Sequence, residues 1–159
     1  MLPLGAGFIS LCPCHNLSLQ ADHQRRFVRS RWNPQASMVK NQKRIAIVDD
    51  DPSMLRATMD LLDAQGFVAR GFPSAEEFLI RGGAAQVDCL LLDIHLGGMS
   101  GIELRNQLKR SGSMLPVIFI TALDDEDTRK QAHRAGCVEF LRKPYSARQL
   151  MDAIGKAVT

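Results

Sequence analysis

Residues 44–52 read RIAIVDDDP, in which four apolar residues are followed by three consecutive carboxylates and a proline. An apolar run this short, bounded by turn signals, is typical of a strand buried in a parallel sheet. Asp51 suits a helix N-cap and Pro52 suits the first helical position. The stretch therefore predicts a strand that passes directly into a helix, with carboxylates in the turn between them.

Three further apolar runs end on a polar residue. They are Cys89–Leu92 before Asp93, Val117–Ile120 before Thr121, and Val138–Arg142 before Lys143 and Pro144. Helix-like stretches separate the runs, which predicts an α/β fold: a doubly wound, five-stranded parallel sheet with five helices. Ligands of such sheets bind beyond the carboxyl ends of the strands. We therefore expect these acids, the hydroxyl and the ammonium to meet at one edge.

The turn signals set the bounds of the elements. We expect strands at residues 44–48, 67–72, 89–93, 117–121 and 138–142, and helices at about 52–65, 74–82, 102–111, 124–135 and from 146 to the C-terminus. Ser74 with Glu77, and Ser146 with Gln149, have the spacing of a capping box, in which two side chains satisfy the free backbone groups of a helix start.

The charge of the chain is uneven. Residues 1–44 hold seven of the 20 Lys and Arg residues but one of the 17 Asp and Glu residues, so the remainder is mildly acidic. Residues 1–42 lack sustained periodicity, and we expect a disordered basic extension before a domain at 43–159. A start at Met38 and an arm for nucleic acid or an anionic surface are the alternatives, although we expect no nucleic-acid partner.

The cysteines and apolar runs exclude several classes of protein. Cys12 and Cys14 lie close to His15, but the spacing is tighter than in usual zinc pairs and no second pair follows. Cys89 lies inside an apolar run and is expected to be a buried small hydrophobe. No apolar run is long enough to span a bilayer, so we expect no membrane partner and a cytoplasmic protein.

The acids at the predicted edge suit a cation and a phosphoryl group. No Gly-rich phosphate loop follows the first strand, and carboxylates there repel a bare phosphate. Asp49, Asp50 and Asp93 offer the hard oxygen ligands that Mg²⁺ prefers. Asp93 is the candidate nucleophile, since an acyl phosphate is a known covalent form of Asp. Lys143 and Thr121 would stabilise the transferred group.

The chain resembles the receiver domain of bacterial two-component response regulators over residues 44–158. The motifs that carry this resemblance are Ile47–Pro52, Leu91–Ile94 with Met99–Gly101, Ile120–Ala122, and Lys143 with Pro144. The family fold is flavodoxin-like, with strand order 2-1-3-4-5. The resemblance implies that Asp93 accepts a phosphoryl group from the phosphohistidine of a sensor histidine kinase or histidine phosphotransfer protein.

The resemblance also implies roles for the other site residues. Asp50, Asp93 and the backbone carbonyl of His95 would ligate Mg²⁺, Asp49 would orient a metal-bound water, and Thr121 and Lys143 would contact the phosphoryl oxygens. The Lys143–Pro144 bond would be cis. In the family's switch, Thr121 moves inward on phosphorylation and an aromatic residue, here Phe140, follows. This would remodel the surface of the fourth helix, fifth strand and fifth helix for an unknown downstream protein or a phosphorylation-dependent dimer.

The sequence departs from the family pattern at Gly97, where a proline often stands. His95 and Leu123, two residues after Asp93 and Thr121, would flank the phosphoryl site. We expect His95 to be a rim residue and expect no output domain in this chain. Whether it is a stand-alone regulator, a phosphate shuttle or a fragment stays open.

Two other functions compete with a signalling switch. A Mg²⁺-dependent phosphatase with an aspartyl-phosphate intermediate would carry a second Asp two residues on, where this chain has His95. A degenerate receiver that only binds partners would lack some of the acids, Thr121 or Lys143. The expectation is therefore a protein that is not an enzyme beyond its own phosphorylation and slow self-dephosphorylation.

Overall fold

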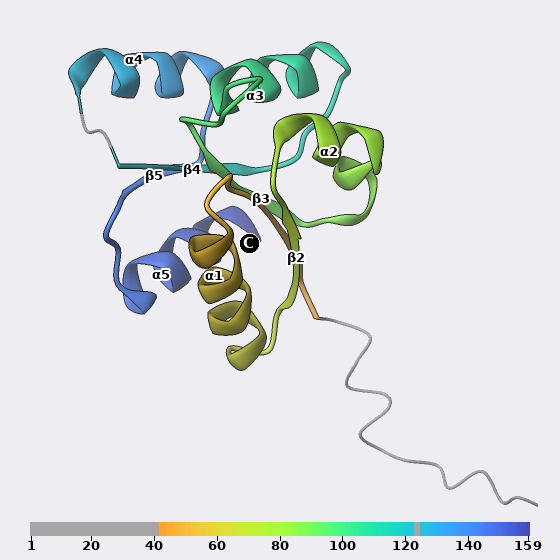
Figure 1. The fold of residues 1–159 in the computed structure, drawn as a ribbon, viewed down its shortest axis with the longest axis vertical. Helices are drawn as coiled ribbons and strands as arrows, with labels where there is room; N and C mark the ends of the chain where they lie inside the picture. Colours follow the sequence, from red (N-terminus) through yellow and green to blue (C-terminus); the bar gives the residue numbers. More distant parts are fainter. Residues whose placement is uncertain (1–41, 123–124) are drawn as a thin grey trace, which may run out of the picture. The chain divides into compact units, whose positions relative to one another are not determined.

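The buried apolar runs form the strands of one parallel sheet in the order β2-β1-β3-β4-β5 (Figure 1). The computed structural model describes residues 42–122 and 125–159. The strands are β1 (Arg44–Val48), β2 (Val68–Phe72), β3 (Cys89–Asp93), β4 (Val117–Thr121) and β5 (Glu139–Arg142). The predicted fold class and strand order are confirmed.

Helices cover both faces of this sheet. They are α1 (Pro52–Ala64), α2 (Ala75–Ile80), α3 (Gly101–Arg110), α4 (Glu126–Ala135) and α5 (Ala147–Ala157), with a short 3₁₀ helix, η2 (Gly83–Gln86), after α2. Helices α1 and α5 lie on one face, and α2, α3 and α4 lie on the other (Figure 1). The connections between the parallel strands thus bury the sheet from both sides.

The two faces explain why the central strands are continuously apolar. In β3, Leu90 and Leu92 pack under α2, α3 and α4, whereas Cys89 and Leu91 pack under α1 and α5. All four side chains are fully buried, which confirms the prediction for Cys89. Burial raises the pKa of the Cys89 thiol to about 12, so the thiol stays protonated at neutral pH.

Polar caps fix where the helices begin. The Asp51 carboxylate accepts hydrogen bonds from the backbone N–H groups of Ser53 and Met54, at 2.8 and 3.3 Å. The predicted capping box of Ser146 and Gln149 is confirmed at the start of α5. A second complete box among the described residues, formed by Ser100 and Glu103, starts α3 and was not expected from the sequence.

The cap of α2 differs in part from the prediction. The Ser74 hydroxyl accepts the Glu77 N–H at 3.1 Å, as a capping box requires. The Glu77 carboxylate, however, contacts Arg81 one turn further along. An ion pair across one turn therefore competes for the side chain that would complete the box.

Other differences are confined to element ends and to one short helix. Strand β2 begins at Val68 and β5 at Glu139, each one residue later than expected, and η2 has no counterpart in the sequence prediction. The predictions for residues 1–41, which concern the disordered basic extension, the zinc site and the nucleic-acid arm, lie outside the described residues. Leu123, expected to flank the phosphoryl site, also lies outside them. Among the residues described, no helix has the length and apolar character needed to cross a bilayer.

Candidate functional site

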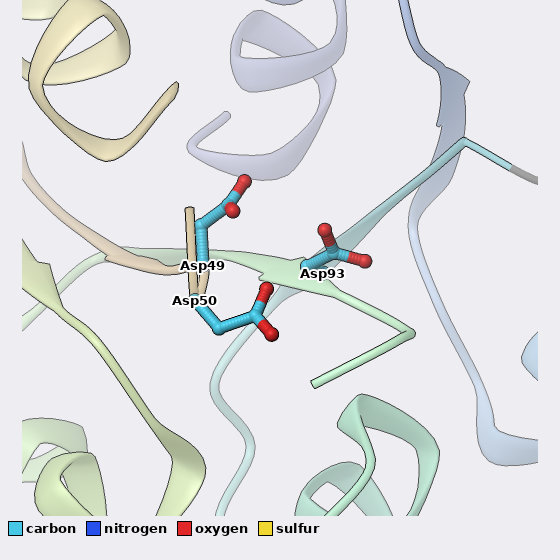
Figure 2. A group of neighbouring side chains, drawn as sticks. All are labelled: Asp49, Asp50 and Asp93. Carbon is cyan, nitrogen blue, oxygen red and sulfur yellow. The ribbon is translucent and has the colours of Figure 1, made fainter. Parts of the chain in front are cut away.

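Three carboxylates gather at the carboxyl end of the sheet. Asp49 and Asp50 follow β1 and Asp93 ends β3, and these strands pair in parallel with Val48 opposite Leu92. An oxygen from each of the three carboxylates lies within 4.8 Å of the others. In Figure 2 the Asp49 and Asp50 side chains extend from the end of β1, with Asp93 beside them. Asp49 and Asp93 are buried, whereas Asp50 is exposed.

Lys143 brings positive charge to two of these acids. Its Nζ donates to Asp49 Oδ2 at 2.7 Å and to Asp93 Oδ2 at 2.5 Å. The Lys143–Pro144 bond is cis, as the resemblance implied. Burial acts to lower the pKa of Lys143, but its hydrogen bonds to the two carboxylates outweigh that effect and raise the pKa. Lys143 is therefore an ammonium throughout the neutral pH range.

The carboxylate set fits a hard divalent cation. Burial raises the pKa of Asp49, the nearby charge of Asp93 adds to this, and Lys143 offsets only part of it. Burial is the main cause of this raised pKa, because it disfavours the charged carboxylate, and a cation bound beside Asp49 would favour the ionised form. Three carboxylates with oxygens this close, one of them reachable from solvent, have the chemistry and geometry of a Mg²⁺ site.

Thr121 lies beside Asp93, at the end of the neighbouring strand β4. Ile120 pairs with Asp93 across the two strands, so Thr121 follows at the same edge. Its side chain is fully buried, and Oγ1 lies 3.1 Å from Nδ1 of the His95 ring. The backbone N–H of His95 in turn donates to Asp93 Oδ1 at 2.9 Å. The structure thus brings together the Asp93 carboxylate, the Thr121 hydroxyl and the Lys143 ammonium at the edge where the sequence predicted them.

Phe140 lies on the neighbouring edge strand, β5. Its half-buried ring packs against the core under α4, with the guanidinium of Arg129 at 5.7 Å from the ring centroid. Beside it, a groove of about 480 Å³ is lined by residues that include Arg142, Lys143 and Gln149. The ring therefore has both a cationic neighbour from α4 and space around it.

Glu76 contacts the site loop but was not predicted to do so. Its Oε1 accepts the Met99 backbone N–H at 2.8 Å, and this hydrogen bond lowers the pKa of the Glu76 carboxyl. A side-chain carbon added at Gly98 would lie 2.8 Å from the same oxygen. The adjacent glycines, Gly97 and Gly98, are a sequence signal for such a close approach, although they do not name the partner.

Tyr145 makes a second contact that the sequence does not reveal. Its hydroxyl lies 3.0 Å from Oγ1 of Thr58 in α1, and the Thr58 side chain is buried. Tyr145 follows the Lys143–Pro144 pair directly. The hydrogen bond between Tyr145 and Thr58 therefore links the segment that carries Lys143 to helix α1.

Replacing Glu76 tests its hold on the loop. Glu76→Ala is expected to speed amide hydrogen exchange at Met99 by roughly tenfold, the scale of one lost hydrogen bond. Glu76→Gln keeps an oxygen acceptor and should change the rate little. Exchange measured by NMR checks both variants, and equal rates at Met99 in Glu76→Ala and the parent would contradict the assignment.

Gly101 lets α3 begin directly against the end of β3. A side-chain carbon at this position would lie 2.1 Å from the backbone carbonyl oxygen of Asp93. We expect Gly101→Ala to reduce the free energy of unfolding by about 1–3 kcal/mol, the usual cost of overpacking. Gly155→Ala, in α5 with nothing within 4 Å, is the matched control and should stabilise slightly. Urea unfolding measures both, and equal stabilities would contradict this packing.

The comparisons with known proteins agree with this geometry. A family model described as "Response regulator receiver domain" matches residues 45–155. The chain is 33% identical over 124 residues to the transcriptional regulatory protein TdiR of Thauera aromatica, an alignment that covers 78% of the chain and 55% of that protein. It is 36% identical over 114 residues to the response regulator protein TodT of Pseudomonas putida, which covers 72% of the chain and 50% of TodT.

A solved structure shows the same architecture. The response regulator StyR superposes with a TM-score of 0.69 at 38% sequence identity, covering 74% of this chain and 60% of StyR. The chain spans about half the length of the curated relatives it matches. Residues 45–155, which the family model matches, include every acid of the carboxylate cluster.

Proposed function

The chain belongs to the response regulator receiver domain family, and on that basis we propose that it is a phosphorylation-dependent switch in which Asp93 accepts the phosphoryl group. The observation that carries the proposal is the position of Asp93, which ends the central strand β3 with one carboxylate oxygen on Lys143 and the other on the His95 N–H. A carboxylate that is buried, oriented and beside a fixed ammonium is arranged for nucleophilic attack on phosphorus.

The donor in this proposal is a phosphohistidine of a sensor histidine kinase or a histidine phosphotransfer protein. An Asp93 oxygen forms the new bond to phosphorus while the bond from phosphorus to the donor nitrogen breaks, and the electron pair of that bond stays on the donor imidazole. Lys143 neutralises the charge on the phosphoryl oxygens, and the Thr121 hydroxyl donates to one of them. Such a donor is made from ATP, so we place the chain in the cytoplasm.

The cation would be held by Asp50, Asp93 and the backbone carbonyl of His95, with Asp49 orienting a water of its shell. When bound, Mg²⁺ supplies positive charge that stabilises the phosphoryl oxygens in the transition state. The protein's own part is to hold the three carboxylates side by side, with Lys143 as a counter-charge for Asp49 and Asp93.

The readout in this proposal is the surface of α4, β5 and α5. Movement of the Thr121 hydroxyl toward a phosphoryl group would vacate space that Phe140 can enter, and Arg129 over its ring would couple that movement to α4. The groove beside Phe140 is then remodelled for a downstream protein or a second copy of the chain. Because the matched relatives are about twice as long, the link to any output segment belongs to the proposal.

Phosphotransfer profiling tests this function. The full chain is mixed with purified, phosphorylated sensor kinases and phosphotransfer proteins from the source organism. We expect rapid, Mg²⁺-dependent transfer of one phosphoryl group per chain from one or a few donors. The contrary result is transfer from none of them together with multiple-turnover hydrolysis of a phosphomonoester, which would identify the alternative phosphatase.

A further inference from the structure

The His95 ring is hydrogen-bonded to the Thr121 hydroxyl, which in the proposed phosphorylated state would instead contact the phosphoryl group. Nδ1 of His95 lies 3.1 Å from Oγ1 of Thr121, although the His95 side chain is exposed and Thr121 is fully buried. His95 also donates its backbone N–H to Asp93, so the residue lies between the acceptor and the hydroxyl. Its ring therefore contacts Thr121 at the position where a phosphoryl group on Asp93 would compete for it.

A hydroxyl has one proton to donate. If Thr121 donates to Nδ1, its proton is unavailable to a phosphoryl oxygen; if Nδ1–H donates to Oγ1, the ring still fixes the orientation of the hydroxyl. A phosphoryl oxygen is a charged acceptor, and hydrogen bonds to charged acceptors are stronger than those between neutral groups. It is therefore favourable for the Thr121 hydroxyl to leave His95 and donate to the phosphoryl oxygen. The net free energy gained is smaller than that of the new hydrogen bond, because the hydrogen bond to His95 is lost.

The structure offers a place for the released ring. A groove of about 500 Å³ lies between α3 and α4 and is lined by residues that include His95, Ile102 and Thr128. An imidazole ring is far smaller than this volume, so it can turn outward without displacing the backbone. The backbone N–H of His95, which donates to Asp93, does not depend on the ring position.

We infer that His95 is a positioning residue: in the unphosphorylated protein its ring holds the Thr121 hydroxyl and so opposes the active arrangement until a phosphoryl group displaces it. This inference rests on the proposed function of Asp93. It assigns to His95 a role in setting the switching equilibrium that is separate from any contribution of its backbone to the cation site.

Beryllofluoride with Mg²⁺, a phosphoryl mimic, tests the inference on the full chain. His95→Leu removes the ring nitrogens and is expected to bind beryllofluoride roughly threefold to tenfold more tightly, the range that one neutral hydrogen bond supports. His95→Asn places an amide group near the position of Nδ1 and should restore an affinity close to that of the parent. NMR titration gives the affinities. In His95→Leu without ligand, the Thr121 methyl signal should also move toward its beryllofluoride-bound position.

The outcomes separate the two proposals. The role of His95 is overturned if His95→Leu binds beryllofluoride within about twofold of the parent, or more weakly than the parent. It is also overturned if His95→Asn gains as much affinity as His95→Leu. In both cases Asp93 remains the proposed acceptor. If the parent chain does not respond to beryllofluoride, or if Asp93→Asn responds as the parent does, the proposed function fails and the role of His95 fails with it.

Discussion

Asp93→Asn is expected to reduce phosphoryl incorporation from acetyl phosphate by at least roughly 1,000-fold, because the amide that replaces the carboxylate is not a nucleophile. The substitution keeps the size of the side chain at the end of β3, so the sheet should remain intact. Incorporation is measured as the mass increase of the intact chain in the presence of Mg²⁺.

Asp88→Asn is the matched control for this loss. Asp88 precedes the same strand at its opposite end, where its carboxylate accepts the backbone N–H of Arg44 at 2.7 Å. The same chemical change there should leave incorporation within about twofold of the parent, since that carboxylate lies away from the acidic cluster. Incorporation that survives in Asp93→Asn, or that falls equally in Asp88→Asn, would contradict the assignment of the acceptor.

Lys143→Met is expected to slow phosphorylation by about 100-fold, because it removes a fixed positive charge from the phosphoryl site. It should also destabilise the Mg²⁺-free protein by up to about 3 kcal/mol, since Asp49 and Asp93 lose the ammonium that compensates their charge. Added Mg²⁺ should recover part of that stability by supplying the missing charge. Phosphorylation kinetics and urea unfolding, with and without Mg²⁺, measure the two effects.

Lys156→Met provides the control for Lys143. Lys156 also pairs with a carboxylate, that of Glu139, but both groups lie at the surface away from the acids. Its loss should leave phosphorylation unchanged.

The raised pKa of Lys143 also predicts a pH window: its pair with the acids persists below the ordinary lysine value of 10.5 and is lost only as the pH rises through the higher folded-state pKa. A rate for Lys143→Met equal to that of the parent would remove Lys143 from the mechanism.

The sequence predicted the central strands better than the edges because burial on both faces leaves a clear signal. Strands β1, β3 and β4 are continuous apolar runs with little exposure, and their predicted bounds are confirmed. The edge strands β2 and β5 carry mixed burial, and both begin one residue later than predicted. Val68 in β2 and Val138 just before β5 are exposed. Helix η2 has no side-chain N-cap and is too short for a periodic apolar pattern, so the sequence does not predict it.

The position of the acids followed from topology, whereas the contacts around them did not. Asp49 and Asp93 come together because β1 and β3 are neighbours in a parallel sheet, which spacing and the strand-end rule predict. The hydrogen bond that the Met99 N–H donates to Glu76, and the hydrogen bond between the His95 ring and the Thr121 hydroxyl, join different elements through side-chain rotamers. No periodicity encodes a rotamer, so these contacts became visible only in the structure.

The most direct measurement is to locate the phosphoryl group itself. The chain is treated with acetyl phosphate and Mg²⁺, reduced with borohydride to convert an aspartyl phosphate to homoserine, digested and sequenced by mass spectrometry. We predict homoserine at position 93 alone, and its loss when EDTA removes the cation. Homoserine at another acid, a phosphoryl group on a side chain outside the site, or unchanged labelling in EDTA would contradict the account.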